Sequence, residues 1–195
     1  LMASILLLRH GQILANRQGR WHGSTDSALT GRGRRQARRT ARHLEIREPA
    51  IKAIYTSPLQ RCLNTAESIG KRLGIEVEVR EDLREYAIGE WEDLSFRELA
   101  ERHDFVNKAA SDPEFAPPDG ESLSQVAQRI VPVVHAINDS HAAQGHGAAM
   151  AIPLAAIIDN DPVVWTSYHL TNCSLTELVL SPSPYVNFFN STQHL

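Results

Sequence analysis

The sequence predicts an α/β fold built on a parallel sheet, and three features carry this prediction. Residues 5–8 are consecutive apolar residues, the pattern of a fully buried strand. Strand-like segments follow at 53–56 and 75–79, and helical patterns at 31–46 and 59–73 separate the three. Alternating strands and helices are typical of a parallel sheet. The length of 195 residues and the apolar share of 42% suit one domain, which we expect to span residues 1–195.

The boundaries of these elements have local signals. Thr30 is a good N-cap for the first helix, and Gly74 is a typical stop after the second. Ser95 and Glu98 have capping-box spacing, which predicts a helix over 95–103. The remaining patterns predict a loop at 112–120, helices at 122–138 and 147–158, a strand at 175–180 and an edge strand at 186–189.

Charge is distributed unevenly along the chain. The net charge of −3 divides into +9 over residues 1–80 and −12 over residues 81–195, so the N-terminal part should attract anions. Six arginines lie between positions 32 and 42 without interleaved aromatic residues, which favours a solvated helix face over a nucleic-acid surface. The apolar N-terminus is too short to span a bilayer. We therefore expect a cytoplasmic protein with no nucleic-acid or membrane partner; the sequence leaves a homodimer open.

Arg9, His10 and Gly11 follow the first buried strand directly. Ligands of open α/β sheets bind at the carboxyl ends of strands, and glycine there permits a sharp turn and a close approach to a ligand. Arg61 follows the second strand and Glu85 the third, so both can reach the same rim. A neutral imidazole is a nucleophile, guanidinium groups match phosphate, and a carboxylic acid can protonate a leaving oxygen. These residues predict phosphoryl transfer, and His146-Gly147 would add a second imidazole and helix N-terminal N–H groups.

Several motifs together resemble one family. Leu7-Leu8-Arg9-His10-Gly11-Gln12 resembles the signature of the histidine phosphatase superfamily, also called phosphoglycerate mutase-like. Further segments resemble its other motifs over most of the chain: residues 23–37, 55–66, 83–92 and 146–147.

The resemblance implies a three-layer α/β sandwich with a mostly parallel central sheet flanked by helices. It implies a phosphohistidine intermediate on His10, a phosphate pocket of Arg9, Arg61 and His146, Glu85 as proton donor, and no metal or cofactor. Phosphate or substrate contacts are expected from the residues around this pocket, namely Asn16, Gln12, His22, Gly23 and Gly147. The expected partner is a small phosphorylated substrate. Its leaving group would meet Trp21, Tyr86, Trp91 and the segment 96–115.

Two rival functions stay open. Family mutases usually carry a longer insertion after the acid segment with additional basic residues. Residues 95–120 are short and contain only Arg97, Arg102 and Lys108 as strong cations, which favours a phosphatase. A phosphoglycerate mutase-type transferase is the first rival, and a catalytically silent phosphate-binding or regulatory module is the second.

The sequence lacks the motifs of other phosphate-binding or cofactor-binding sites. Cys62 has no arginine cradle a few residues downstream, so we expect a packed helix residue rather than a cysteine phosphatase nucleophile. Gly31-Arg32-Gly33 follows no strand and is not a dinucleotide fingerprint. The other histidines show no metal-ligand spacing. One departure from the family concerns residues 138–145, which are polar where an apolar strand should precede His146. We hypothesise that residues are missing between about 143 and 145.

Overall fold

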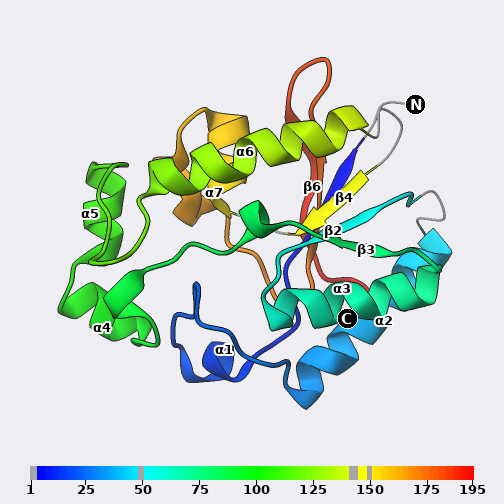
Figure 1. Ribbon diagram of the computed structural model, residues 1–195, viewed down its shortest axis with the longest axis horizontal. Helices are drawn as coiled ribbons and strands as arrows, with labels where there is room; N and C mark the ends of the chain where they lie inside the picture. Colours follow the sequence, from blue (N-terminus) through cyan, green and yellow to red (C-terminus); the bar gives the residue numbers. More distant parts are fainter. Residues whose placement is uncertain (1–3, 48–50, 141–144, 149–150) are drawn as a thin grey trace.

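The computed structural model describes residues 4–47, 51–140, 145–148 and 151–195. The strands within these ranges form one six-stranded sheet in the order β3-β2-β4-β1-β5-β6 (Figure 1). The strands are β1 (Ile5–Leu8), β2 (Ile54–Thr56), β3 (Val77–Val79), β4 (Gly145–Ala148), β5 (Leu175–Val179) and β6 (Tyr185–Ser191). The pairs β3-β2, β2-β4 and β4-β1 are parallel, whereas β1-β5 and β5-β6 are antiparallel. The sheet is therefore mixed, and the prediction of a mostly parallel sheet is not confirmed.

Helices cover both faces of the sheet. One face carries α2 (Gly31–Arg47) and α3 (Gln60–Leu73), and the other carries α6 (Leu123–Ser140), with α7 (Ala151–Leu154) at its side (Figure 1). Side chains of β1 alternate between the two layers because successive residues of a strand point to opposite faces. Ile5 and Leu7 pack in the core beneath α6, whereas Leu6 packs with α2 and α3.

The remaining elements are short and lie in the connections between these strands and helices. They are α1 (Leu14–Gln18), α4 (Phe96–Glu101), α5 (Phe105–Ser111), the 3-10 turns η1 (Glu81–Leu83), η2 (Gly89–Trp91) and η4 (Pro162–Ser167), and the π-helical turn η3 (Ala155–Asp159). Local signals explain several boundaries. Thr30 Oγ1 accepts from Gly33 N at 3.0 Å, the Ser95–Glu98 capping box is formed, and Gly74 ends α3 with φ 69°.

The segment around His146 differs from the prediction. Residues 147–158 were expected to form one helix, but Gly145–Ala148 forms β4, and helical turns begin only at Ala151. The sheet needs an extended segment between β1 and β2, and the polar residues 138–140 belong to α6. The glycine-containing segment 145–148 takes that place. The proposed gap between about 143 and 145 adjoins residues 141–144, which lie outside the described residues.

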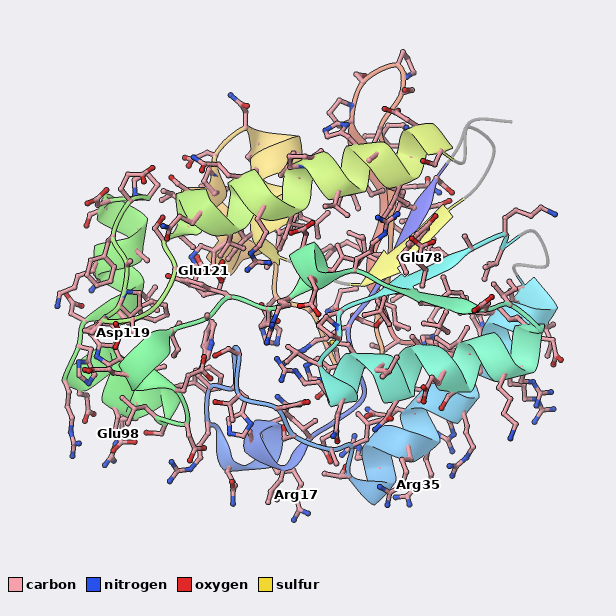
Figure 2. The ribbon with its side chains drawn as sticks, in the orientation of Figure 1. Arg17, Arg35, Glu78, Glu98, Asp119 and Glu121 are labelled. Carbon is pink, nitrogen blue, oxygen red and sulfur yellow. The ribbon has the colours of Figure 1, made fainter. Side chains whose placement is uncertain are left out.

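The arginines of α2 lie on the solvent-exposed side of that helix. Figure 2 shows Arg17 and Arg35 together beside α1 and α2, while Glu98, Asp119 and Glu121 lie toward α4, α5 and α6. The charge asymmetry of the sequence is thus also an asymmetry in space. Within the described part of the chain, no helix is both long and apolar enough to cross a membrane.

Candidate active site

His10 lies just past the carboxyl end of β1 and is half-buried. Its Nδ1 lies 2.8 Å from the Gly11 carbonyl oxygen. Because that oxygen only accepts, Nδ1–H is the donor, and the neutral ring keeps its lone pair on Nε2. Burial, followed by the charges of Arg61 and Arg9, lowers the pKa of His10 to about 3. The ring is therefore uncharged at neutral pH, as a nucleophile requires.

Two arginines supply the positive charge that acts on His10. Arg61, in the first turn of α3, is wholly buried and donates to the carbonyl oxygens of Thr25 at 2.8 Å and Gly23 at 2.6 Å. Its Nε has no hydrogen-bond partner among the described residues. Arg9 donates to the Leu170 carbonyl oxygen. Burial lowers the pKa of Arg9, Glu85 raises it and Arg61 lowers it, so both neighbouring groups act on the Arg9 guanidinium.

Glu85 reaches the same place from the segment after η1. Its Oε1 accepts from Tyr86 N at 3.0 Å. The segment is held by Arg129 of α6, which donates to the carbonyl oxygens of Arg84 at 2.7 Å and Glu85 at 3.4 Å. Arg129 is itself fixed by two hydrogen bonds to Glu121, at 2.8 and 2.7 Å. A bidentate ion pair between Arg129 of α6 and Glu121, two residues before that helix, thus positions the candidate acid.

A cavity of about 340 Å³ opens at this point and is lined by Arg9, His10 and Glu85 at one end. Arg61 is not among the residues that line this cavity. Of the aromatic residues expected to face a leaving group, Trp21, Tyr86 and Phe96 line the cavity. Trp91 and Phe115 do not line it: they pack on each other with ring centroids 6.1 Å apart.

Gly23 joins the loop around Arg61 to the segment that carries Glu85. A Cβ at Gly23 would lie 2.0 Å from the Tyr86 carbonyl oxygen and 2.7 Å from Glu92 Oε1, so no larger residue fits there without movement. Gly23 N also donates to Glu92 Oε2 at 2.9 Å. Its role in this structure is close packing. The same holds for Gly11, where a Cβ would meet the Gly33 carbonyl oxygen at 2.6 Å; the backbone it approaches belongs to α2 rather than to a ligand.

Of the remaining predicted binding residues, two line the cavity and Gln12 does not. Asn16 and His22 line the cavity. Asn16 Oδ1 accepts from Ile13 N at 3.1 Å, and His22 Nε2 lies 2.9 Å from Asp93 Oδ1. Gln12 lies outside the cavity lining, and its Oε1 accepts from the Thr30 hydroxyl at 3.1 Å.

The structure does not bring His146 and Gly147 level with His10. In the parallel register of β1 and β4, His146 pairs with Leu6 and Gly147 with Leu7. The backbone of His146 thus lies four positions before that of His10, roughly 13 Å along the strand direction. The predicted helix N-terminus at Gly147 is also absent, because that residue belongs to β4.

Sequence reasoning missed three residues that hold the site together. Glu92 accepts hydrogen bonds from the backbone N–H groups of the loop 23–25. Arg129 donates to the carbonyl oxygen of Glu85. Asn172 Nδ2 donates to the His10 carbonyl oxygen and to Asn16 Oδ1, each at 3.1 Å. Each of these partners is far away in the sequence, so no local sequence pattern predicts the contacts. For Glu92 alone, its place in the motif 83–92 was a signal. The described residues contain no group of three histidine, cysteine or acidic side chains that could hold a metal ion.

Comparison with known proteins places this geometry in context. Residues 5–187 match the profile of the histidine phosphatase superfamily, branch 1. The first curated relatives are mycobacterial proteins that are 39% identical to this chain over 127 residues. The aligned part is 65% of this chain and 35% of those proteins, so the chain spans about a third of their length.

Other relatives match along more of their length. A glucosyl-3-phosphoglycerate phosphatase of Mycolicibacterium vanbaalenii is 33% identical, covering 82% of this chain and 78% of that protein. A probable phosphoglycerate mutase of Erwinia tasmaniensis is 30% identical, covering 95% and 88%. Among solved structures, a phosphoserine phosphatase mutant of Entamoeba histolytica in complex with phosphoserine superposes with a TM-score of 0.86, at 27% identity and over 100% of both chains.

Proposed function

Because the chain belongs to the histidine phosphatase superfamily, we propose that it is a phosphomonoesterase that hydrolyses a small phosphorylated metabolite through a phosphohistidine on His10. One observation carries the proposal. His10 is held neutral, with Nδ1–H on the Gly11 carbonyl oxygen, at the end of a cavity that Arg9 and Glu85 also line. The proposal takes residues 1–195 as one domain, in agreement with a family match over 5–187.

The mechanism assigns one task to each group. His10 Nε2 attacks phosphorus while Arg9 and Arg61 supply positive charge to the phosphoryl oxygens. Glu85 gives its proton to the leaving alcohol oxygen as the P–O bond breaks. The resulting carboxylate then takes a proton from water, whose oxygen attacks the phosphohistidine and releases inorganic phosphate and neutral His10.

The binding assignments have unequal support. Asn16 lines the cavity and stays a phosphate-contacting residue in the proposal. His22 and Gly23 act through the loop that encloses Arg61, since both of their carbonyl oxygens accept from it. Gln12, His146 and Gly147 stay in the proposal on their motifs alone.

The cations of residues 95–120 favour a phosphatase over a mutase. Arg97 lies 3.6 Å from Glu101, Arg102 lies 3.4 Å from Glu98, and Lys108 lies over the Phe115 ring. None of these three cations is among the residues that line the cavity. A mutase needs positive charge for the second anionic group of its substrate, and this segment supplies none to the cavity. The relatives named as phosphatases support the same choice.

The test uses p-nitrophenyl phosphate and a panel of phosphorylated sugars, glycerates, nucleotides and amino acids, with release of inorganic phosphate as the readout. His10→Ala should abolish turnover of every substrate, and His135→Ala, at an exposed position on α6, should not change it. Wild-type protein quenched during turnover of a ³²P-labelled substrate should carry acid-labile phosphate that His10→Ala lacks. Full activity of His10→Ala would refute the mechanism.

The same experiment separates the rivals. Transfer of phosphate between the hydroxyls of a glycerate, without release of inorganic phosphate, would support the mutase. A purified wild-type protein that turns over no substrate and forms no phosphoenzyme would support the silent phosphate-binding module.

A further inference from the structure

The cavity that begins at His10 changes character away from the phosphate end. Beyond Arg9, His10 and Glu85, most of its lining is aromatic or aliphatic, contributed by α4, α5, α6, α7 and η4 and by the loops that carry Trp21 and Tyr86. Part of the rim is apolar as well, because Phe96 and Val106 line the cavity and are 54% and 43% exposed, whereas Thr166 and His169 form a polar part of it. Large apolar side chains that are left exposed at the edge of a cavity mark a binding surface.

Trp21 is the centre of an aromatic cluster in this wall. Its ring is nearly perpendicular to those of Tyr86, Phe96 and Trp165, with centroids 6.1, 5.9 and 5.9 Å away. Edge-to-face packing of this kind adds to the stability of each contact. The wall is therefore packed before a substrate arrives, and an apolar group can bind without first ordering it. Its buried polar atoms without a hydrogen-bond partner among the described residues are Trp21 Nε1, Tyr86 Oη and Trp165 Nε1.

Two of the three further basic side chains in the wall already have a partner. Among the described residues that line the cavity, the basic side chains other than Arg9 and His10 are Arg20, His22 and His169. Arg20 Nη1 lies 3.7 Å from Asp93 Oδ2, and His22 Nε2 lies 2.9 Å from the other oxygen of that carboxylate. His169 is exposed. Apart from His169, no described basic side chain of the wall beyond the phosphate end is left for a carboxylate on the leaving group, and burying such a carboxylate among apolar side chains is costly.

We propose that the alcohol part of the substrate is uncharged and predominantly apolar, of the size of an aryl or branched alkyl group. This inference rests on the proposed phosphatase function and adds to it the substrate class. Phosphate binds at the His10 end, and the alcohol part lies against Trp21, Phe96 and Trp165. Substrates with a second anion, such as phosphoserine or 3-phosphoglycerate, are expected to be poor.

The test compares primary alkyl phosphates, so that the leaving alcohols differ little in chemical reactivity. Burying one phenyl ring in this wall should make kcat/KM for phenethyl phosphate roughly 10- to 100-fold higher than for ethyl phosphate. Phosphoserine and 3-phosphoglycerate should not exceed ethyl phosphate. If either of these two substrates has a higher kcat/KM than phenethyl phosphate, the inference is overturned.

Variants at the rim locate the effect. Phe96→Ala should lower the preference for phenethyl phosphate over ethyl phosphate, expressed as a ratio of kcat/KM values, about tenfold. Val106→Lys should raise the relative activity toward 3-phosphoglycerate. Ile46→Ala, which removes a 63% exposed apolar side chain at the end of α2, should leave both unchanged. Unchanged preferences in Phe96→Ala and Val106→Lys contradict the assignment of the wall. Hydrolysis with the opposite preference refutes only this inference, whereas no hydrolysis of any ester refutes the proposed function.

Discussion

Glu92 should stabilise the loop around Arg61 through its negative charge, and Glu92→Gln tests this. One carboxylate oxygen of Glu92 accepts from Gly23 N at 2.9 Å and Thr25 N at 3.3 Å. The other accepts from Ser24 N at 2.9 Å, the Ser24 hydroxyl at 3.2 Å and Ile88 N at 3.1 Å. Glutamine has the same shape but one acceptor oxygen. Whichever oxygen becomes an NH₂ group, at least two backbone N–H groups lose their acceptor.

The size of the effect follows from these contacts. A buried donor left without an acceptor costs about 1–3 kcal/mol. Glu92 is half-buried, so water can partly replace the lost acceptor, and we expect a decrease of about 2–4 kcal/mol in the free energy of unfolding. Because Arg61 donates to carbonyl oxygens of the same loop, kcat/KM should also fall, about tenfold.

The assay is urea unfolding of the wild type, Glu92→Gln and Glu90→Gln, where Glu90 is an exposed neighbour in η2. The midpoint should fall by roughly 1–2 M for Glu92→Gln at an unchanged m-value, and it should stay constant for Glu90→Gln. A difference below about 0.5 kcal/mol between Glu92→Gln and the wild type would refute the reasoning, because that is the range of unremarkable surface substitutions.

The pH dependence gives an independent check on Glu92. Burial raises the pKa of its carboxyl group, but the hydrogen bonds from the loop and from Ile88 lower it more, so the net pKa lies below the ordinary 4.5. A carboxyl group with a depressed folded-state pKa stabilises the protein above its unfolded pKa, and this stabilisation is lost as the pH falls through the folded value. The stability gap between wild type and Glu92→Gln should therefore be constant above pH 5 and close in more acidic solution.

Four further predictions concern the surroundings of the nucleophile. Arg129→Lys replaces a bidentate guanidinium and should lower kcat of the proposed reaction at least tenfold with little change in KM, measured by steady-state kinetics. Asn172→Ala should lower kcat three- to tenfold, while Asn172→Asp, which cannot donate through that atom, should not restore it. The unfolded chain binds a proton on His10 near pH 6.5 and the folded protein only near 3, so stability should fall as the pH falls between these values, and less so in His10→Asn. Burial raises the pKa of Cys62 to about 11, so Cys62→Ser should keep activity within twofold and iodoacetamide should not inactivate the wild type at pH 7.

The sequence predicted the elements that carry their own signals. Strand β1, helices α2 and α3 and the capping box at Ser95 were found within a few residues, because apolar periodicity and caps are local. Strand β4 was not predicted, since Gly145–Ala148 has neither apolar alternation nor β-branched residues. Its position is set by the need to fill the sheet between β1 and β2, which is a requirement of the tertiary structure.

The candidate site was predicted to a similar degree. Arg9, His10, Arg61 and Glu85 follow strands directly or through one loop, so topology alone places them at one rim. The placement of Gln12 outside the cavity and of His146 level with Leu6 depends on hydrogen bonds and register that a single sequence does not encode locally. Glu92, Arg129 and Asn172 were missed for the same reason, because the groups that they hold lie dozens of residues away in the sequence.

The antiparallel strand β5 has a structural consequence for the nucleophile. An antiparallel neighbour begins where β1 ends, so the segment that leads into β5 must pass the Arg9–His10 pair. That segment contacts both residues: Leu170 accepts from the Arg9 side chain, Cys173 N donates to the Arg9 carbonyl oxygen at 3.0 Å, and Asn172 donates to the His10 carbonyl oxygen. A parallel strand at this position would begin at the far end of β1 and leave these groups without partners. The mixed sheet therefore supplies the rigid support that His10 needs as the proposed nucleophile.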